Sequence, residues 1–197
     1  MKTRLLGIVG SLGNESLTRT AIASALRHAE SLGAEVRTWD LRDRPLPIFS
    51  PERPENEAYR AGSKDVDWAN AILLGSPDYH GSMSGVMKNC LDYFWKEFAG
   101  KLFGYICASH EKGLLPMEQM RTSVRQCYGW SLPYGVAVTD GDFDMASGIP
   151  KNPKLEQRLQ MLAHDLTKYA PLLYKQFESD RSESQPHGFA SYYKPRT

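Results

Sequence analysis

The sequence predicts an α/β fold, a three-layer α/β/α sandwich whose middle layer is a five-stranded parallel sheet. Three observations predict it. Five short runs with strand character alternate along the chain with segments whose apolar residues recur at helical spacing. Several of these runs are apolar at consecutive positions, which is typical of parallel strands covered by helices on both faces. The chain has 197 residues, enough for one domain with a sizeable core.

The first two elements are a strand and a helix. Residues 3–10 form a continuous apolar run, which predicts a buried strand. Leu17, Ala21 and Ala25 recur at helical spacing and predict a helix over 16–31. A glycine follows shortly afterwards and is the expected C-cap of this helix.

Two more strands follow, separated by an irregular connection and a helix. The alternating run 35–41 predicts the second strand. The connection 45–54 is rich in proline, which excludes regular structure because proline breaks both helices and strand ladders. A helix is expected over 56–70 and the third strand over 71–76. We expect Pro77 to end this strand, because proline has no N–H group for the ladder.

The second half of the chain continues the alternation. Helices are expected over 84–98 and 114–128, and strands over 101–108 and 135–139. A long helix over 153–177 completes the predicted fold.

The chain divides into a periodic part and a tail. Residues 1–178 are expected to form a single domain. Residues 179–197 lose the periodicity and are expected to be flexible or packed on a partner subunit.

The expected sheet predicts where a ligand binds. In open parallel sheets, ligands bind beyond the carboxyl ends of the strands, where the strand order reverses. We expect the flavodoxin-like order 2-1-3-4-5, which places this point between the first and third strands. The loops that follow Gly10, Gly75 and Ala108 are therefore the candidate binding loops.

Composition and charge exclude several classes of protein. Charged residues make up 24% of the chain and the formal net charge is +1, which indicates neither a nucleic-acid-binding surface nor an acidic solvating chain. Cys90, Cys107 and Cys127 are odd in number and widely spaced, which favours reduced thiols in the cytoplasm over disulfides or a zinc site. No apolar run is long enough to span a membrane, and the apolar start reads as a strand rather than a signal peptide.

The first candidate loop, 10-GSLGNESLTR-19, leads from a strand into a helix through glycine, hydroxyl and amide residues. Backbone N–H groups at a helix N-terminus can hold a phosphate. The loop has neither a P-loop Gly-Lys-Ser/Thr nor the dinucleotide fingerprint spacing, which favours a phosphate monoester. The alternative is an ordinary turn capped by Asn14 or Ser16, in which Arg19 is solvated instead of assisting a phosphate.

The second candidate loop follows the third strand and reads 76-SPDYHGSMSG-85. Gly81 allows a flat ligand to approach the backbone, and Tyr79 and His80 offer planar side chains beside it. The string GSMSG resembles the nucleophile elbow of hydrolases, but Met83 stands where the serine is required. His80 has no second metal ligand at useful spacing, so we interpret it as a packing or hydrogen-bonding residue rather than a catalytic base.

The longer stretch 76-SPDYHGSMSGVMKNCLDYF-94 resembles the motif of the NADPH-dependent FMN reductase family, which includes azobenzene and quinone reductases. In that family Pro-Glu-Tyr, a small loop and Gly-x-x-Lys-Asn-x-(Leu/Ile)-Asp recur. The resemblance extends to 10-GSLGNESLTR-19 and to 109-SHEKGLLPMEQMRTSVRQCYGWSLP-133. It departs at Gly13, where many members have arginine, and at Asp78, where glutamate is commoner.

The resemblance implies that FMN lies at the strand ends, held by residues of all three loops. The implied cofactor-binding residues are Ser11, Asn14, Ser16, Leu17 and Thr18 around the phosphate, Pro77, Asp78, Tyr79, His80 and Gly81 along the ring, and Ser109, His110, Glu111, Lys112 and Gly113 on the other side. Arg19 would neutralise the phosphate in place of the missing arginine. Lys88, Asn89 and Asp92 also match the motif, and we interpret them as structural, through capping or contact with a second subunit.

The resemblance also implies an FMN-dependent NAD(P)H oxidoreductase with a ping-pong cycle. NADPH or NADH would deliver a hydride to FMN, and a quinone, azo compound, free flavin or metal ion would then accept the electrons. No catalytic side chain, bound metal, nucleic acid or membrane is expected, and the family commonly forms homodimers or homotetramers. The alternatives are a non-enzymatic flavodoxin-type electron carrier, which the near-neutral charge disfavours, and a flavin-free scaffold domain.

Overall fold

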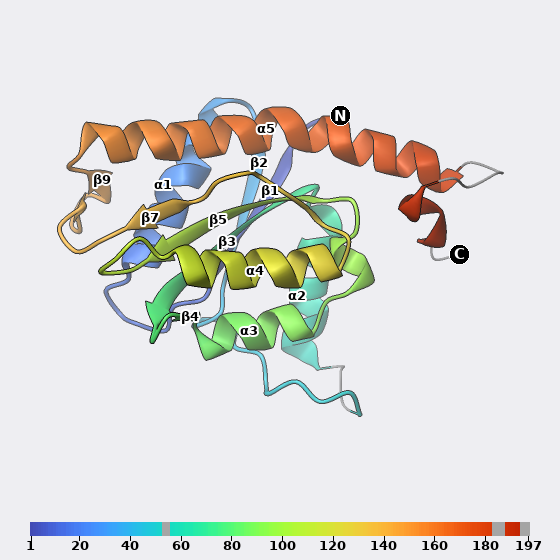
Figure 1. Cartoon of the computed structure of the whole chain (residues 1–197), viewed down its shortest axis with the longest axis horizontal. Helices are drawn as coiled ribbons and strands as arrows, with labels where there is room; N and C mark the ends of the chain where they lie inside the picture. Colours follow the sequence, from blue (N-terminus) through green and yellow to red (C-terminus); the bar gives the residue numbers. More distant parts are fainter. Residues whose placement is uncertain (53–55, 183–187, 194–197) are drawn as a thin grey trace.

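A parallel sheet in the order β2-β1-β3-β5 forms the middle layer of the protein (Figure 1). The computed structural model describes residues 1–52, 56–182 and 188–193. The four long strands are β1 (Arg4–Val9), β2 (Glu35–Asp40), β3 (Ala71–Tyr79) and β5 (Leu102–Ala108). The α/β class and the expected strand order are confirmed, with β5 as the fourth strand of that order.

The fifth strand is split into two short pieces. β6 (Trp130–Ser131) pairs with the start of β5, and β7 (Val136–Val138) pairs with its end. Between them lies Pro133, which has no N–H group for a ladder. The strand expected over 135–139 is found as β7. The sequence pattern did not predict β6, the first piece of the fifth strand.

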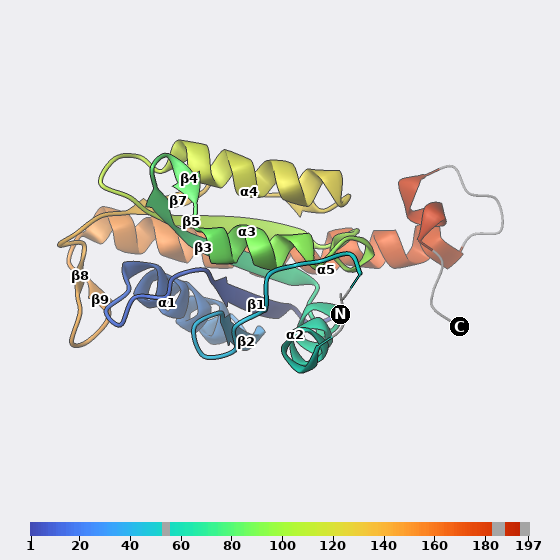
Figure 2. The same ribbon diagram turned by 90° about the horizontal axis from the view of Figure 1, so that it is seen from below.

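Helices cover both faces of the sheet (Figures 1 and 2). The first face is covered by α1 (Leu17–Ser31) and α5 (Pro153–Ser182). The second is covered by α2 (Glu57–Trp68), α3 (Gly85–Asp92) and α4 (Leu114–Gln126). This arrangement is the three-layer sandwich expected from the alternation of strands and helices.

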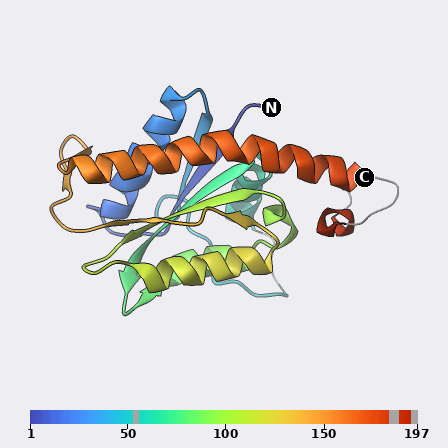
Figure 3. The same cartoon turned by 45° about the horizontal axis from the view of Figure 1, so that its top comes forward.

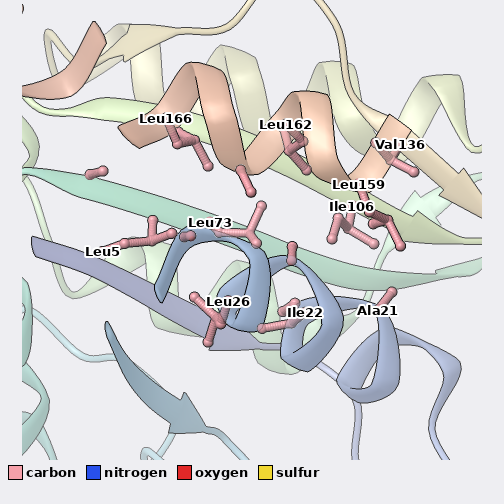
Figure 4. Packing of buried hydrophobic residues seen from close by; sticks show 14 of the residues in the cluster. Leu5, Ala21, Ile22, Leu26, Leu73, Ile106, Val136, Leu159, Leu162 and Leu166 are labelled. Atoms are coloured by element: carbon pink, nitrogen blue, oxygen red, sulfur yellow. The ribbon is translucent and has the colours of Figure 1, made fainter. Parts of the chain in front are cut away.

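Each face of the sheet has its own hydrophobic core. On the first face, Ile22 and Leu26 of α1 and Leu162 of α5 gather over Leu73 and Ile106 of the sheet (Figure 4). All of them are at most 5% exposed. This core fixes α1 against the sheet, and α1 in turn carries the first candidate loop at its amino end.

The core on the second face is rich in aromatic rings. Trp39 meets Phe94 edge to face at 5.9 Å, and Phe98 meets Phe103 in the same way at 5.0 Å. Tyr93, Phe94 and Phe98 are buried here, so several aromatic residues near the end of α3 are core rather than surface. Such pairs add specific geometry to the area that they bury.

The helix expected over 84–98 ends earlier, at Asp92. The N–H group of Trp95 donates to the side-chain carboxylate of Glu97 (3.0 Å), a local bond that competes with continuation of the helix. A short 3-10 turn, η1 (Lys96–Phe98), follows. Apolar spacing alone does not detect this competition.

The last helix is longer than expected, since α5 continues to Ser182. Polar pairs one turn apart stabilise its final turns: Gln176 donates to Asp180 (2.6 Å), and Arg181 bonds Glu178 (2.6 Å). The apolar periodicity fades there, which is why the sequence pattern placed the end too early.

β3 continues past the proline that was expected to end it, and Pro77 pairs with Ala108 of β5. Backbone groups alternate sides along a strand, so Pro77 faces the same side as Gly75. The carbonyl of Gly75 accepts the last hydrogen bond from the β1 side, donated by the N–H of Gly10 (2.8 Å). Beyond that bond β1 has ended, so the missing N–H of the proline interrupts no ladder.

Two small elements complete the described chain. A hairpin of β8 (Phe143–Asp144) and β9 (Ile149–Pro150) follows β7. The turn η2 (Phe189–Tyr192), from the predicted tail, lies against the end of α5 (Figure 3) and forms a small cluster with Phe177. Among the described residues, no helix is long and apolar enough to cross a lipid bilayer.

Gly62 gives a test of the packing between α2 and the sheet. A Cβ atom at this position would overlap the ring of Trp39, which is fully buried. We expect Gly62→Ala to destabilise the protein by about 1–3 kcal/mol, although alanine is the better helix former, because the ring has no room to move. Urea unfolding followed by circular dichroism measures the change.

Gly85→Ala is the matched control for this substitution. Gly85 also lies in a helix, and an added Cβ there meets no atom within 4 Å. Its midpoint is expected to stay the same or rise. Equal midpoints for Gly62→Ala and the unchanged protein would contradict the close packing.

Candidate active site

Three loops meet at the carboxyl edge of the sheet, where they follow β1, β3 and β5. In Figure 1 these loops lie at the end of the molecule that carries β4, away from the C-terminal end of α5. A cleft of about 150 Å³ opens between them. It is lined by Leu17, Pro77, Asp78, Tyr79, Ala108, Ser109, His110, Thr139 and Asp140. Residues predicted on all three loops are among them.

The remaining predicted residues lie on the same three loops or at the adjoining helix ends, and they do not line the cleft. They are Ser11, Asn14, Ser16, Thr18, His80, Gly81, Glu111, Lys112 and Gly113. Glu111 and Lys112 are exposed, whereas Gly113 is buried and is the N-cap of α4. The structure therefore brings the three loops together as expected, with the third loop contributing mainly through its first two residues.

The loop between β1 and α1 offers free backbone donors. Ser16 is the N-cap of α1, and its hydroxyl accepts the N–H of Arg19 (3.2 Å). Within the described part of the chain, no backbone N–H group of residues 12–18 donates to a protein acceptor. Free N–H groups at a helix N-terminus, together with the helix dipole, favour an anion.

Arg19 holds this loop in place instead of facing a ligand. Its Nε lies 2.5 Å from a carboxylate oxygen of Asp40, whose side chain is 9% exposed. Its Nη1 donates to the carbonyl of Gly13 (3.1 Å), and its Nη2 lies 3.4 Å from the carbonyl of Ser11. The guanidinium is thus engaged by Asp40 and by loop carbonyls. These contacts give Arg19 a positioning role, and the neutralisation of a phosphate by Arg19 stays a prediction.

Ser84 joins the ends of β1 and β3. Its hydroxyl donates to the carbonyl of Gly10 (2.6 Å), and its backbone N–H donates to the hydroxyl of Ser76 (2.8 Å). The same Ser84 hydroxyl accepts the N–H of Met87 (3.2 Å), so Ser84 is the N-cap of α3. Both serines are buried, and their bonds fix the point where the strand order reverses.

The segment after β3 is a tight hairpin, not the open loop expected from the sequence. β3 turns back into β4 (Ser82–Met83), with His80 and Gly81 as the two turn residues. Their φ angles are 57° and 76°, as a type I′ turn requires. Glycine adopts this geometry freely, whereas histidine does so at some cost. His80 is exposed, and Tyr79 before it is 56% exposed.

Asp78 links this hairpin to the loop after β5. One carboxylate oxygen accepts the N–H of Gly81 (2.9 Å), and the other accepts the hydroxyl of Ser109 (2.9 Å). The Ser109 hydroxyl accepts the N–H of Glu111 (3.1 Å) in turn. Burial and the charge of Asp78 raise the pKa of the Cys107 thiol to about 12, so this thiol stays protonated and is not a nucleophile.

Thr139 and Asp140 line the cleft but were not predicted. They follow β7, whose carboxyl end reaches the same edge of the sheet. A carboxylate oxygen of Asp140 lies 3.6 Å from Nδ1 of His110, and both side chains are exposed. The sequence could have revealed both residues, because they follow the expected fifth strand and the loop after that strand lies at the same edge of the sheet.

Comparison with known protein sequences identifies the family. The family model described as NADPH-dependent FMN reductase matches residues 3–144. The chain belongs to this family. The FMN-dependent NADPH-azoreductase of Staphylococcus aureus (strain USA300) is 31% identical over 146 residues, which cover 69% of this chain and 77% of the azoreductase. The resemblance found in the sequence motifs is therefore confirmed.

Solved structures agree with the fold of this FMN reductase family member. FerB, a flavoenzyme NAD(P)H:(acceptor) oxidoreductase from Paracoccus denitrificans, matches with a TM-score of 0.73 and 18% identity over 88% of this chain and 99% of FerB. A flavodoxin from the domain Archaea matches with a TM-score of 0.62 and 14% identity over 86% of this chain and 99% of the flavodoxin. The flavodoxin-like fold is thereby confirmed.

Three motif residues of this family member lie on α3, outside the cleft. Asn89 donates to the carbonyl of Pro47 (2.8 Å) and accepts the N–H of Phe49 (2.8 Å), which fastens the proline-rich connection to α3. Lys88 and Asp92 form an ion pair one helical turn apart (2.5 Å) on the exposed side of α3. The contacts of Asn89 are structural, but they hold the proline-rich connection instead of capping a helix.

Removal of the Arg19 guanidinium tests its positioning role. Arg19→Met leaves the Asp40 carboxylate buried without its partner, and we expect a loss of about 2 kcal/mol or more of unfolding free energy. Urea unfolding of the protein without added flavin measures it. Arg42→Met is the matched control, since Arg42 is exposed and lies 3.5 Å from the carbonyl of Gly13. Equal stability of the two variants would argue against the positioning role.

Proposed function

We propose that the cleft at the ends of β1, β3 and β5 is where this chain, an FMN-dependent NAD(P)H oxidoreductase by its family, holds FMN and reduces a small acceptor. One observation carries the placement: loops with the family's motif residues converge on one edge of the sheet, at the point where strand order reverses. The proposed cofactor-binding residues are those implied by the family resemblance, with Thr139 and Asp140 added.

The first loop fits the phosphate of FMN. The N–H groups of residues 12–18 are free donors within the described chain, and the side chains of Ser11, Asn14 and Thr18 add polar groups beside them. A monoester phosphate held by neutral donors at a helix N-terminus needs no cationic side chain at Gly13. Arg19 supports this arrangement from behind by holding the carbonyls of the same loop.

The cleft between the second and third loops fits a flat ring. When bound, FMN supplies a ring that accepts a hydride from a reduced nicotinamide and passes the electrons to the acceptor. Tyr79 lies on one wall of the cleft, with His80 next to it in the turn of the hairpin, and Ser109 and His110 form the other wall. Asp78 ties the two walls together through its bonds to Gly81 and Ser109, so the site is organised before a ligand enters.

The side chains of the site position ligands and do not react with them. Both carboxylate oxygens of Asp78 accept hydrogen bonds from the protein. The Cys107 thiol is protonated because its pKa is raised to about 12 by burial and by the charge of Asp78. His80 is an exposed turn residue. We accordingly assign no catalytic side chain.

We propose the acceptors and the assembly from the surface around the cleft, and the location from the cysteines. An open cleft with planar walls suits quinones, azo compounds, free flavin or metal ions, which we propose as acceptors. Tyr79, Leu114 and Leu115 are each more than half exposed beside the cleft, which supports a homodimer or homotetramer that covers them. The three free cysteines support a cytoplasmic setting.

Turnover with a panel of acceptors tests the proposed function. The purified protein is expected to bind FMN and to oxidise NADPH or NADH when a benzoquinone, an azo dye, free riboflavin or a ferric complex is present. Parallel double-reciprocal plots at varied donor and acceptor concentrations are expected, because one space serves both substrates in turn. Ferricyanide consumption or azo bleaching reports the acceptor side independently of NADPH absorbance.

Two results would contradict this function in different ways. A protein that stays colourless after incubation with FMN would exclude every flavin-dependent function. A protein that holds FMN but oxidises neither nicotinamide with any acceptor would favour the flavodoxin-type electron carrier.

His80 tests whether the wall of the cleft takes part in chemistry. His80→Ala is expected to weaken FMN binding by up to about tenfold or to change the relative rates of different acceptors, because it removes one planar contact. Turnover is expected to persist, since the imidazole transfers no proton. His80→Gly is the matched variant, because it removes the ring and suits the positive φ of the turn. Complete loss of turnover in FMN-loaded His80→Ala protein would show a catalytic role.

A further inference from the structure

A second cavity, of about 270 Å³, lies at the other end of the sheet from the candidate active site. It is lined by Asp67, Lys96, Glu97, Ala99, Lys101, Tyr174, Phe177, Arg181, Tyr192 and Tyr193. These residues come from the ends of α2 and α5, from η1 and η2, and from the residue before β5. β5 runs over seven residues between the two sites, so they are roughly 20 Å apart. Figure 3 shows η2 and the end of α5 far from β4.

Lys101 is the unusual residue of this cavity. Only 3% of the residue is exposed, which is rare for a lysine. Its ammonium has three N–H donors, and in the described part of the chain its one hydrogen-bond acceptor is the carbonyl of Ala69, which ends α2. The ammonium also lies 5.1 Å from the ring centre of Tyr174. The carbonyl accounts for one donor, and two donors are left on a side chain that lines the cavity.

Arg181 adds a second cationic side chain to the cavity, and only part of its donors have an acceptor. Its Nη1 donates to Glu178 (2.6 Å), and its guanidinium lies over the ring of Phe177 at 5.5 Å. Its Nε is buried and has no acceptor among the described residues. The two remaining donors of Lys101 and the guanidinium of Arg181 both line the cavity, so they favour a ligand that brings acceptor atoms.

The other walls indicate the body and charge of such a ligand. Tyr174, Phe177 and Tyr193 offer aromatic surface, against which a flat ring packs well. Two carboxylates, of Asp67 and Glu97, also line the cavity, but three cationic side chains line it as well. A ligand with a single negative charge and an aromatic ring matches both the donors and the walls.

We propose that this cavity binds a small aromatic carboxylate, whose carboxylate accepts hydrogen bonds from Lys101 and Arg181 and whose ring packs among the tyrosines. The site is separate from the FMN cleft and adds a ligand-binding function to the reductase. Part of its wall comes from Tyr192 of η2 and from Tyr193 directly after it.

The protonation of Lys101 gives this site a measurable signature. Burial lowers the pKa of Lys101 to about 8; Arg4 and Arg181 also lower it, whereas Asp67 and Glu178 raise it. Above pH 8 the free protein therefore holds a partly neutral amine, and a bound carboxylate raises its pKa by favouring the ammonium. Binding is expected to take up a proton near pH 8.5, and not near pH 6.5, where the amine is already protonated.

Calorimetric titration with benzoate tests the proposal. The protein is loaded with FMN so that the cleft is filled, and the titration is repeated without FMN. Benzoate is expected to bind saturably in both cases. Its uncharged analogue benzamide is expected to bind at least about tenfold more weakly, because it cannot form charge-assisted hydrogen bonds. Heats measured near pH 8.5 in two buffers of different ionisation enthalpy report the proton uptake.

Two variants and one control locate the site. Lys101→Met is expected to weaken benzoate binding at least about tenfold and to abolish proton uptake, and Arg181→Gln is expected to weaken binding severalfold. Lys168→Met, on the exposed side of α5, is the control and is expected to bind as before. NADPH turnover is expected to be the same in all three, because none of these residues lies near the cleft.

Several results would overturn the proposal. These are benzoate binding that is no tighter than benzamide binding, or benzoate binding that is unchanged by Lys101→Met. Should Lys101→Met fail to fold, unchanged affinity in Arg181→Gln or absence of proton uptake by the unmodified protein near pH 8.5 would equally overturn it. Loss of NADPH turnover without loss of benzoate binding would bear on the FMN cleft alone.

Discussion

The offset between β1 and β3 determines the shape of the carboxyl edge of the sheet. The N–H of Gly10 makes the last bond from the β1 side, to the carbonyl of Gly75, but β3 continues as far as Tyr79. Beyond Gly75, the side of β3 that faces β1 is therefore unpaired. Pro77 is tolerated there because no hydrogen bond is lost, and the chain can turn back as a hairpin. The hydroxyl of Ser84 closes the offset by bonding the carbonyl of Gly10. The first loop, the hairpin and the start of α3 all take their positions from it.

The close approach of α1 to the sheet sets the position of the first loop. A Cβ atom on Gly75 would lie 2.5 Å from Ile22 and 2.9 Å from Thr18, so the helix rests directly on the bare backbone of β3. In the first turn of the same helix, Arg19 reaches Asp40 at the end of β2. The turn that offers free N–H groups to an anion is thus held by strands on two sides. A rigid donor set of this kind binds without the cost of ordering a loop.

The sequence predicts which residues meet at the carboxyl edge of the sheet better than it predicts those that meet at the opposite end. The motif residues of the carboxyl edge lie in three short stretches of sequence. The general rule that ligands bind beyond the carboxyl ends of parallel strands predicts from the sequence alone that these stretches meet. Thr139 and Asp140 were missed only because the rule was applied to three strands and not to the fifth. At the opposite end, Lys101, Arg181 and Tyr193 come from segments with no shared motif. Their meeting depends on the length of α5, which apolar spacing underestimates, and on the position of η2.

The sequence by itself determined the fold class, the order of the elements and the family, because these depend on periodicity and on motifs that are local in the chain. Only the tertiary structure decided which side of β3 Pro77 faces, that Arg19 is engaged by Asp40, and that Lys101 is buried beside Ala69. Arg19 and Asp40 are 21 residues apart, and Lys101 and Ala69 are 32 apart. A local pattern cannot reveal a partner at that separation, since the contact exists only after the sheet has formed.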